Sequence, residues 1–214
     1  MKSILIVGLG RFGRHMARKF IEEGNSVLAI EANETRADRA VSFINDIQIA
    51  DATDEEFIKS LGVNNFDICV VAIGDNFQSA LETTVLLKDH GAKFIIARAT
   101  REVHKKLLLR NGADHVVYAE KETAERLAIK YGSKHLFDYI ELSDDVAICE
   151  IAVPDGWAGK TIVQKAVRNK YGITILATKQ GEEIFPLPAP DHVFLKNETL
   201  LILASEEHLQ ALLK

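Results

Sequence analysis

Three glycines near the N-terminus follow the pattern Gly-x-Gly-x-x-Gly, at residues 8, 10 and 13. Gly8 permits a tight turn, Gly10 lets a pyrophosphate approach the backbone, and Gly13 lets a helix pack close to a strand. A strand-like run precedes the pattern and a helix-like run follows it, so phosphates would lie over a helix N-terminus, where free N–H groups favour an anion. The spacing therefore predicts a nucleotide-binding loop; the alternative is glycines that serve packing alone.

Polar residues recur where the next strands are expected to end. Glu31 closes the second strand, about 20 residues after the loop, where an acid binds ribose hydroxyls and disfavours the 2′-phosphate of NADP. Ligands of open α/β sheets bind at such carboxyl ends. The further expected binding residues are Asp51, Ala52, Thr53, Ile73, Gly74, Asp75 and Arg98. For Asp51, Thr53 and Asp75, helix capping is the alternative role.

Arg11 lies inside the glycine loop, beside Phe12, which we also assign to the site. A cation has little structural purpose at this position. It would contact the terminal phosphate of a nucleotide bound by the same chain or by a neighbouring subunit.

The elements that must position these residues alternate along the first part of the chain. Strand-like runs cover residues 3–7, 26–31, 47–50, 67–72, 93–98 and 115–118, and helix-like runs cover 12–23, 34–45, 54–61, 76–90 and 102–111. Glycines at 24, 62, 91 and 112 follow four of the helices, where a left-handed residue is favoured. This alternation predicts an α/β fold: a Rossmann-type doubly wound parallel sheet in the order 3-2-1-4-5-6.

The pattern changes after a helix expected at 120–135. Strands are expected at 139–142, 146–153, 173–178, 183–185 and 199–204, with helices near 160–170 and 205–213. The proline-rich run 186–190 is expected to be an extended surface loop, because proline cannot donate in a central strand. We therefore predict a nucleotide-binding domain at 1–137 and a small α+β domain at 138–214. A unit this small is near the lower size limit for an independent core, so we expect it to dimerise.

Composition excludes several classes of protein. The 214 residues carry 26 Lys and Arg against 31 Asp and Glu, a net charge of -5, which argues against nucleic acid as the main partner. Cys69 and Cys149 lie in apolar runs, as expected of buried thiols in a reducing compartment. The N-terminus lacks signal-peptide architecture, and no apolar run approaches the ~18–20 residues that span a bilayer. We expect a cytoplasmic protein.

Catalytic patterns are missing from the sequence. It contains no Tyr-x-x-x-Lys pair, nucleophile elbow, H-E-x-x-H or clustered metal ligands, so we expect no enzyme but a nucleotide sensor. An NAD-dependent oxidoreductase of a small substrate is the alternative, and it needs a proton-transfer residue facing the nicotinamide. A redox-sensing transcription repressor would need a helix-turn-helix segment with a basic face.

Four segments, at 6–13, 67–76, 111–121 and 170–177, together resemble the regulator-of-potassium-conductance (RCK) family. Within it, the chain is similar to the KtrA/TrkA-type cytosolic regulatory subunits of bacterial potassium uptake systems, over essentially its whole length. The resemblance implies dimers that form an octameric ring on a KtrB- or TrkH-type membrane potassium channel or transporter, at the inner face of the plasma membrane. ATP, ADP or NAD(H) in the N-terminal site would open or close the ion path.

The resemblance also implies roles for individual residues. Gly8, Gly10 and Gly13 would line the phosphates, Glu31 would bind ribose, Asp51 and Arg98 would complete the pocket, and Arg11 would sense the terminal phosphate. Glu120 matches an acid that binds a divalent cation (calcium or magnesium) or sodium at the dimer interface; the alternative is a first-turn carboxylate stabilised by the helix dipole. Arg168 and residues 171–175 match a region that binds cyclic di-adenosine monophosphate (cyclic di-AMP) in some relatives. The family more often has aspartate at position 31, which leaves the choice between ATP and NAD open.

Overall fold

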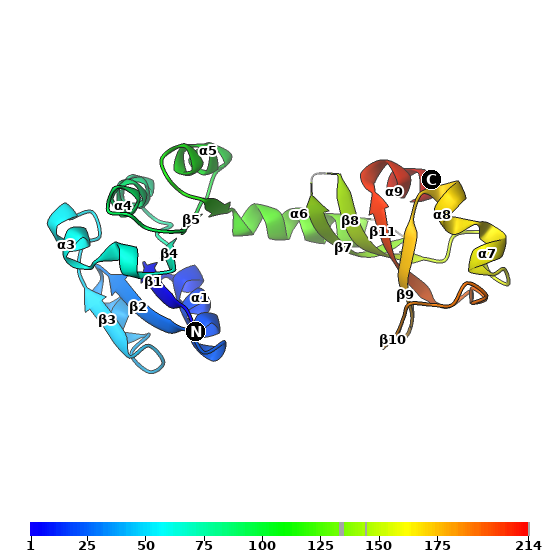
Figure 1. The fold of residues 1–214 in the computed structure, drawn as a ribbon, viewed down its shortest axis with the longest axis horizontal. Helices are drawn as coiled ribbons and strands as arrows, with labels where there is room; N and C mark the ends of the chain where they lie inside the picture. Colours follow the sequence, from blue (N-terminus) through cyan, green and yellow to red (C-terminus); the bar gives the residue numbers. More distant parts are fainter. Residues whose placement is uncertain (133–134, 144, 214) are drawn as a thin grey trace. The chain divides into compact units, whose positions relative to one another are not determined.

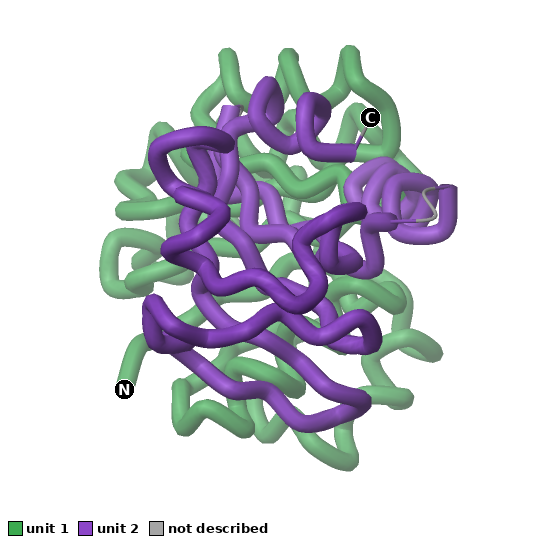
Figure 2. Tube along the Cα trace, turned by 90° about the vertical axis from the view of Figure 1, so that its right-hand side faces the viewer, with its two compact units in different colours: residues 1–120 green, residues 121–214 purple. Residues whose placement is uncertain are grey.

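The computed structural model describes residues 1–132, 135–143 and 145–213. The chain forms two compact units, residues 1–120 and 121–214 (Figures 1 and 2). The division into domains at 1–137 and 138–214 stays a prediction.

Unit 1 is built on a six-stranded parallel sheet in the order β3-β2-β1-β4-β5-β6, which confirms the expected topology (Figure 1). Its strands are β1 (Ser3–Val7), β2 (Ser26–Glu31), β3 (Asp46–Ile49), β4 (Ile68–Val71), β5 (Ile95–Arg98) and β6 (His115–Val117). Because β1 pairs with β2 on one side and β4 on the other, the loop after β1 lies where the strand order reverses.

Both faces of this sheet are buried. Leu5 and Val7 of β1 pack in one hydrophobic cluster, whereas Ile4 and Ile6 pack in another, as the alternation of side chains along a strand requires. The helices of unit 1 are α1 (Arg11–Glu22), α2 (Glu34–Asp38), α3 (Glu55–Ser60), the 3₁₀ turn η1 (Val63–Asn65), α4 (Phe77–Asp89) and α5 (Glu102–Arg110). The four glycines expected after helices all have positive φ, between 62° and 113°.

The helix expected at 34–45 was wrong in length. It ends at Asp38, and turns follow, in which the Phe43 and Ile44 N–H groups both donate to the Ala40 carbonyl. These turns bury Ala40 and Ile44. Burial of apolar side chains therefore outweighs continuation of the helix, which Ser42 and Asn45 support poorly.

Unit 2 contains a five-stranded antiparallel sheet in the order β10-β9-β11-β8-β7. Its strands are β7 (Leu136–Ser143), β8 (Val146–Ala152), β9 (Thr174–Gln180), β10 (Glu183–Pro186) and β11 (Thr199–Ser205), and its helices are α6 (Ala119–Gly132, which starts in unit 1), α7 (Ile162–Lys165), α8 (Val167–Tyr171) and α9 (Glu206–Leu213). Trp157 and Phe194 lie in its core, with ring centroids 5.1 Å apart.

Three expectations for unit 2 need correction. The helix expected to reach His135 is α6, described to Gly132; residues 133–134 lie outside the described residues, and His135 directly precedes β7. The single helix expected at 160–170 is divided at Ala166, whose φ of 48° is left-handed. Pro186 is not in a loop but ends β10, an edge strand, where proline's missing N–H leaves no ladder bond unmade.

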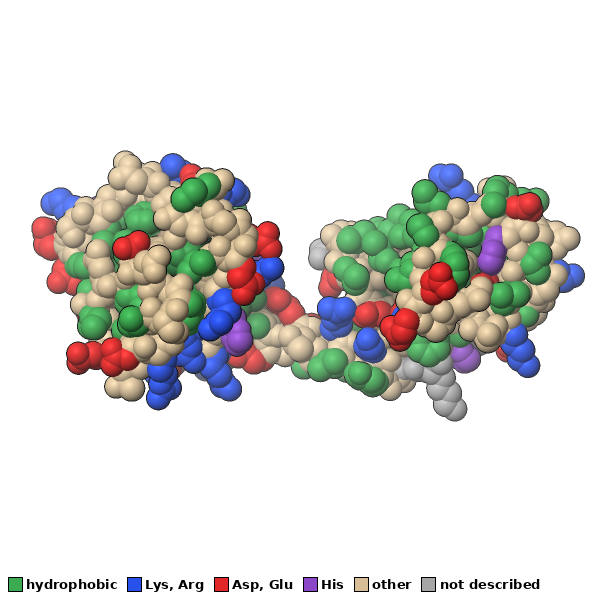
Figure 3. All heavy atoms as spheres, turned by 90° about the horizontal axis from the view of Figure 1, so that it is seen from below, with side chains coloured by type: hydrophobic (Ala, Val, Ile, Leu, Met, Phe, Trp, Pro, Cys, Tyr) green, Lys and Arg blue, Asp and Glu red, His purple; other side chains and the backbone are tan. Residues whose placement is uncertain are grey.

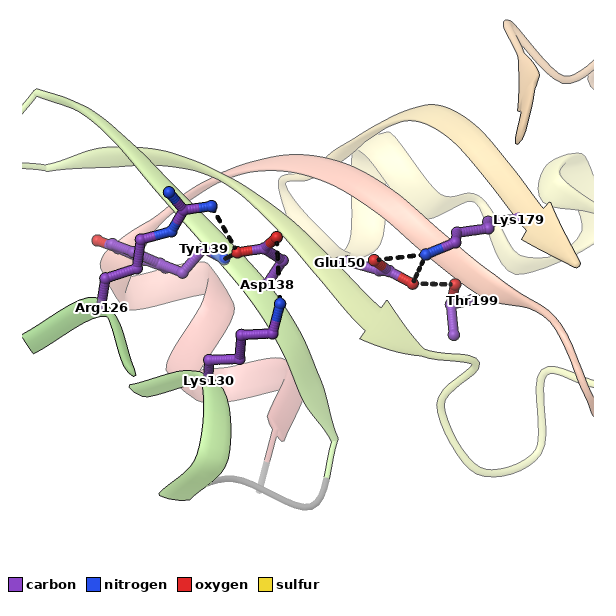
Figure 4. Close-up of polar contacts among 7 residues, drawn as sticks. All are labelled: Arg126, Lys130, Asp138, Tyr139, Glu150, Lys179 and Thr199. Carbon is purple, nitrogen blue, oxygen red and sulfur yellow. Dashed lines mark hydrogen bonds and ion pairs between the residues drawn. The ribbon is translucent and has the colours of Figure 1, made fainter. Parts of the chain in front are cut away.

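Two polar clusters lie on the elements of unit 2 (Figure 4). Asp138 of β7 binds Arg126 and Lys130 of α6, at 3.1 Å and 3.6 Å, so the helix is tied to the sheet. Glu150 of β8 binds the Lys179 ammonium at 3.2 Å and accepts a 2.7 Å hydrogen bond from the Thr199 hydroxyl. These contacts join β8 to β9 and β11.

The two cysteines are buried thiols, as expected. Burial raises the pKa of Cys69 to about 12 and that of Cys149 to about 11, so neither is a thiolate at neutral pH.

On the face seen in Figure 3, hydrophobic side chains reach the surface of both units among charged ones. Within the described residues, no helix combines the length and the apolar composition needed to cross a membrane.

Candidate functional site

A cleft of about 900 Å³ lies at the carboxyl ends of the parallel strands of unit 1. This volume suits a small-molecule ligand. Ten of the expected binding residues line it: Gly8, Gly10, Arg11, Glu31, Asp51, Ala52, Ile73, Gly74, Asp75 and Arg98. Phe12, Gly13 and Thr53 do not line the cleft. Each of them lies against a residue that does: Arg98, Gly8 and Asp51, respectively.

The three glycines of the loop have different roles: two allow close packing, and one leaves the backbone accessible to a ligand. Gly8 has a φ of 96°, and a Cβ at Gly13 would overlap the carbonyl oxygen of Gly8, so both glycines shape the loop. Gly10, by contrast, precedes α1 and has no atom within 4 Å of where its Cβ would stand. The backbone at Gly10 is therefore open to the cleft, at the end of α1 that favours a phosphate.

Glu31 organises the loops around the cleft. Its side chain is buried, with 5% of the residue exposed, and its two oxygens accept hydrogen bonds from backbone N–H groups, at 2.6 Å from Leu9 and 2.9 Å from Asn33. A carboxylate offers about four acceptor sites, so capacity for a ribose hydroxyl remains. Ribose binding by Glu31 stays a prediction.

Asp51 and Asp75 do not cap helices; Asp54 caps α3 and Asn76 caps α4. The capping alternative is therefore wrong for these two aspartates, and also for Thr53. The Thr53 backbone N–H and hydroxyl both donate to Asp51 Oδ1, at 2.9 Å and 2.8 Å. These bonds, the one from the backbone first, hold the pKa of Asp51 below its ordinary value. Both aspartates are ionised acceptors at neutral pH.

Arg98 connects the cleft to the start of α6. Its guanidinium lies against Gly74, pairs with Glu120, and stands 5.8 Å from the Phe12 ring centroid. The Glu120 carboxylate accepts a hydrogen bond from the Glu120 backbone N–H, which lowers its pKa. Burial raises this pKa, and the hydrogen bond and charge of Arg98 lower it further. Phe12 thus supports Arg98 from outside the cleft.

The surroundings of Glu120 do not fit a cation within one chain. Its partner is a guanidinium, and no cluster of three His, Cys, Asp or Glu suitable for a metal occurs in the described part of the chain. A lone carboxylate paired with arginine offers a cation too few oxygen ligands.

Several cleft residues were missed by the sequence analysis: Arg14, Asn33, Arg36, Arg39 and Ser79. The Arg14 guanidinium donates to the Leu9 carbonyl at 2.7 Å, and that of Arg36 pairs with Asp75 at 2.7 Å. Arg36 and Arg39 follow the second strand within eight residues of Glu31, which was the available signal. With Arg11 and Arg98, five arginines face three carboxylates along the cleft, a balance that favours an anionic ligand.

The segment expected to match a cyclic dinucleotide region is partly core. Ile173 is 1% exposed and Tyr171 packs on Trp157, with centroids 4.8 Å apart. Arg168 of α8 is exposed. Binding of a second messenger there stays a prediction.

Two known domain families match most of the chain. Residues 4–119 match the TrkA-N domain and residues 147–214 the TrkA-C domain. The chain is 36% identical to the Ktr system potassium uptake protein C of Bacillus subtilis (strain 168), over 95% of this chain and 92% of the relative. It belongs to the Ktr family of potassium uptake proteins. Potassium uptake protein A of the same organism is 34% identical over 98% of this chain and 94% of the relative.

Membership of the Ktr family confirms the expected resemblance and the expectation that the chain is not an enzyme. The fold of this Ktr-family chain also matches a solved GsuK channel bound to NAD, with a TM-score of 0.71 and 21% identity over 99% of this chain and 38% of that one. A GsuK structure bound to ADP matches 60% of this chain and 34% of that one, with a TM-score of 0.52 and 20% identity. This chain thus spans well under half of those channel chains.

Proposed function

We propose that this Ktr-family chain is the nucleotide-sensing regulatory subunit of a bacterial potassium uptake system. An adenine nucleotide in the cleft of unit 1 would open or close a separate KtrB- or TrkH-type membrane channel or transporter. The chain would act in the cytoplasm, at the inner face of the plasma membrane. The observation that carries this proposal is the cleft itself, where an open glycine backbone and five arginines meet at the reversal of strand order.

The lining residues suit the parts of an adenine nucleotide. Phosphates would lie over Gly10 and the N-terminus of α1, with Arg11 at the terminal phosphate. Ribose would lie at Glu31, and the base near Asp51 and Ile73. The NAD and ADP bound to the GsuK channel, which shares this fold, support a ligand of this class.

Gating requires that the ligands be distinguished. A ligand shifts an equilibrium between two states only by its differential affinity for them. ATP and ADP differ at the γ-phosphate, and a charge-assisted contact from Arg11 to that group would contribute ~1.5–3 kcal/mol. Arg11 is therefore the residue that we assign to the discrimination.

Assembly completes the proposal. We expect dimers that form an octameric ring, as the family resemblance implies. A calcium, magnesium or sodium ion at Glu120 would need ligands from a second subunit or from the nucleotide. Cyclic di-AMP would bind between the TrkA-C domains, near Arg168.

Calorimetric titration of the purified protein tests the proposal, with ATP, ADP, NADH and cyclic di-AMP, each with and without calcium or magnesium. We expect micromolar binding of ATP and ADP and a difference between them that depends on the cation. Rubidium uptake into vesicles containing the partner transporter should then respond to the bound nucleotide. A chain that binds neither ATP, ADP nor NADH, or whose bound nucleotide leaves uptake unchanged, would contradict the proposal.

A further inference from the structure

One ion pair in the cleft joins a short helix and a loop that are far apart in the sequence. Arg36 belongs to α2, after β2, and Asp75 belongs to the loop between β4 and α4. Their Nη2 and Oδ2 atoms are 2.7 Å apart. Both residues line the cleft.

In the sheet, the strand that precedes the glycine loop lies between the strands that precede Arg36 and Asp75. β2 and β4 flank β1 on opposite sides, and strands two apart in a sheet are separated by about 10 Å. Arg36 and Asp75, which follow β2 and β4, therefore approach each other from the two sides of β1, and Gly8, which starts the glycine loop after β1, lines the same cleft.

Without a ligand the pair is weak and reversible. The Arg36 and Asp75 side chains are 41% and 60% exposed, and exposed ion pairs contribute little to stability. Arg36 holds the pKa of Asp75 below its ordinary value, so protonation does not open the pair near neutral pH.

We infer that Arg36 and Asp75 form a clasp that closes over the adenosine part of a bound nucleotide and slows its release. A ligand beneath the pair would exclude water from one side of it and strengthen the attraction between the charges. The planar guanidinium engages Asp75 by its edge, which leaves a face for stacking on a purine. The coupling between ligand binding and the ion pair is reciprocal. If the ligand strengthens the ion pair, the ion pair strengthens binding of the ligand to the same degree. This inference rests on the proposed binding of adenine nucleotides.

The clasp would contact the adenosine part of the ligand, whereas Arg11 would contact its terminal phosphate. Adenosine is common to ATP, ADP and NADH, so loss of the clasp should affect all three ligands to a similar degree. Arg39 provides a matched control, because it lines the same cleft and carries the same charge as Arg36. Replacing Arg39 changes the charge of the cleft without removing either partner of the pair.

The test measures dissociation rates by stopped-flow displacement of etheno-ADP, a fluorescent base analogue, with affinities for unmodified ADP, ATP and NADH from calorimetry. The variants are Arg36→Gln, Asp75→Asn, the double variant, the reciprocal exchange Arg36→Asp with Asp75→Arg, and Arg39→Gln. We expect each single variant to raise the dissociation rate about fivefold or more and the double variant to add nothing further. The reciprocal exchange should restore part of the retention, and association rates should change little.

Three results would overturn the clasp. The first is an equal rise in dissociation rate for Arg39→Gln and Arg36→Gln, and the second is a double variant whose dissociation rate shows that the effects of the single variants add. The third is a loss of affinity that comes from slower association alone. The parent protein separates this inference from the function on which it rests. If the parent binds no adenine nucleotide, the proposed function fails; if it binds and the variants release the ligand at the parent rate, only the clasp fails.

Discussion

The Leu9 backbone N–H donates a hydrogen bond to the Glu31 carboxylate, with 2.6 Å between N and Oε2. The acid at the end of β2 therefore holds the glycine loop that follows β1. Its other oxygen accepts from Asn33, just before α2. One buried side chain thus sets the shape of two loops at the cleft.

Glu31→Ala should both destabilise unit 1 and weaken every adenosine ligand. Two backbone donors lose a buried charged acceptor, which costs about 1–3 kcal/mol. Urea unfolding followed by circular dichroism measures the loss. The only tryptophan, Trp157, lies in the core of unit 2, so an unchanged fluorescence transition is the internal control. Full stability with full nucleotide affinity would show that the loops do not depend on Glu31.

Gly10→Ala and Gly13→Ala should fail in different ways. The methyl at position 10 enters open space, so stability should fall by no more than about 1 kcal/mol, while phosphate binding is lost. The methyl at position 13 overlaps the Gly8 carbonyl oxygen, so the backbone must shift, at a cost of about 1–3 kcal/mol or more. Thermal unfolding and ADP titration of both variants separate the two roles. Normal ADP affinity of Gly10→Ala would place the phosphates elsewhere.

Arg11→Ala should lower ATP affinity about 10- to 100-fold and change ADP affinity by no more than about twofold. The expected loss is that of one charge-assisted contact to the γ-phosphate. Calorimetry of both ligands measures it. Lys19→Ala, which removes a positive charge from the same helix at a residue that does not line the cleft, is the control. Equal losses for ATP and ADP would remove Arg11 from the discrimination.

Stability of unit 1 should fall as the pH drops from about 7 to 5, in part because of His104. Its ring stacks on Phe77, with centroids 3.8 Å apart. Partial burial, and then the charge of Arg101, lower the pKa of His104. The unfolded chain therefore takes up the proton at a higher pH than the folded one, so protonation favours unfolding.

His104→Phe keeps a stacked ring without the titration. Urea midpoints from circular dichroism at pH 7.5 and 5.5 should differ less in this variant than in the parent. The fluorescence transition of Trp157 should keep its pH dependence. An identical pH dependence by circular dichroism in both proteins would exclude His104 as a contributor.

Local rules made much of unit 1 predictable. The glycine spacing, the strand before it and Glu31 follow from short-range requirements, because each depends on residues within one βαβ segment. The helix ends marked by glycine could be predicted for the same reason, because the left-handed residue that ends a helix is a local requirement. Where burial of apolar side chains competed with propensity, as in the turns after Asp38, the pattern alone gave the wrong helix length, and it gave no sign of the left-handed residue at Ala166 that divides the helix expected at 160–170.

The sequence by itself determined the parallel sheet, the position of the nucleotide loop and the residue types at the strand ends. Tertiary structure alone decided which polar groups meet: Arg36 with Asp75, Arg98 with Glu120, and Glu31 with the Leu9 N–H. These partners are 39, 22 and 22 residues apart, and several carboxylates were available to each arginine. Periodicity fixes which face a side chain occupies, whereas the choice among partners depends on distances and rotamers that exist only after the strands have paired.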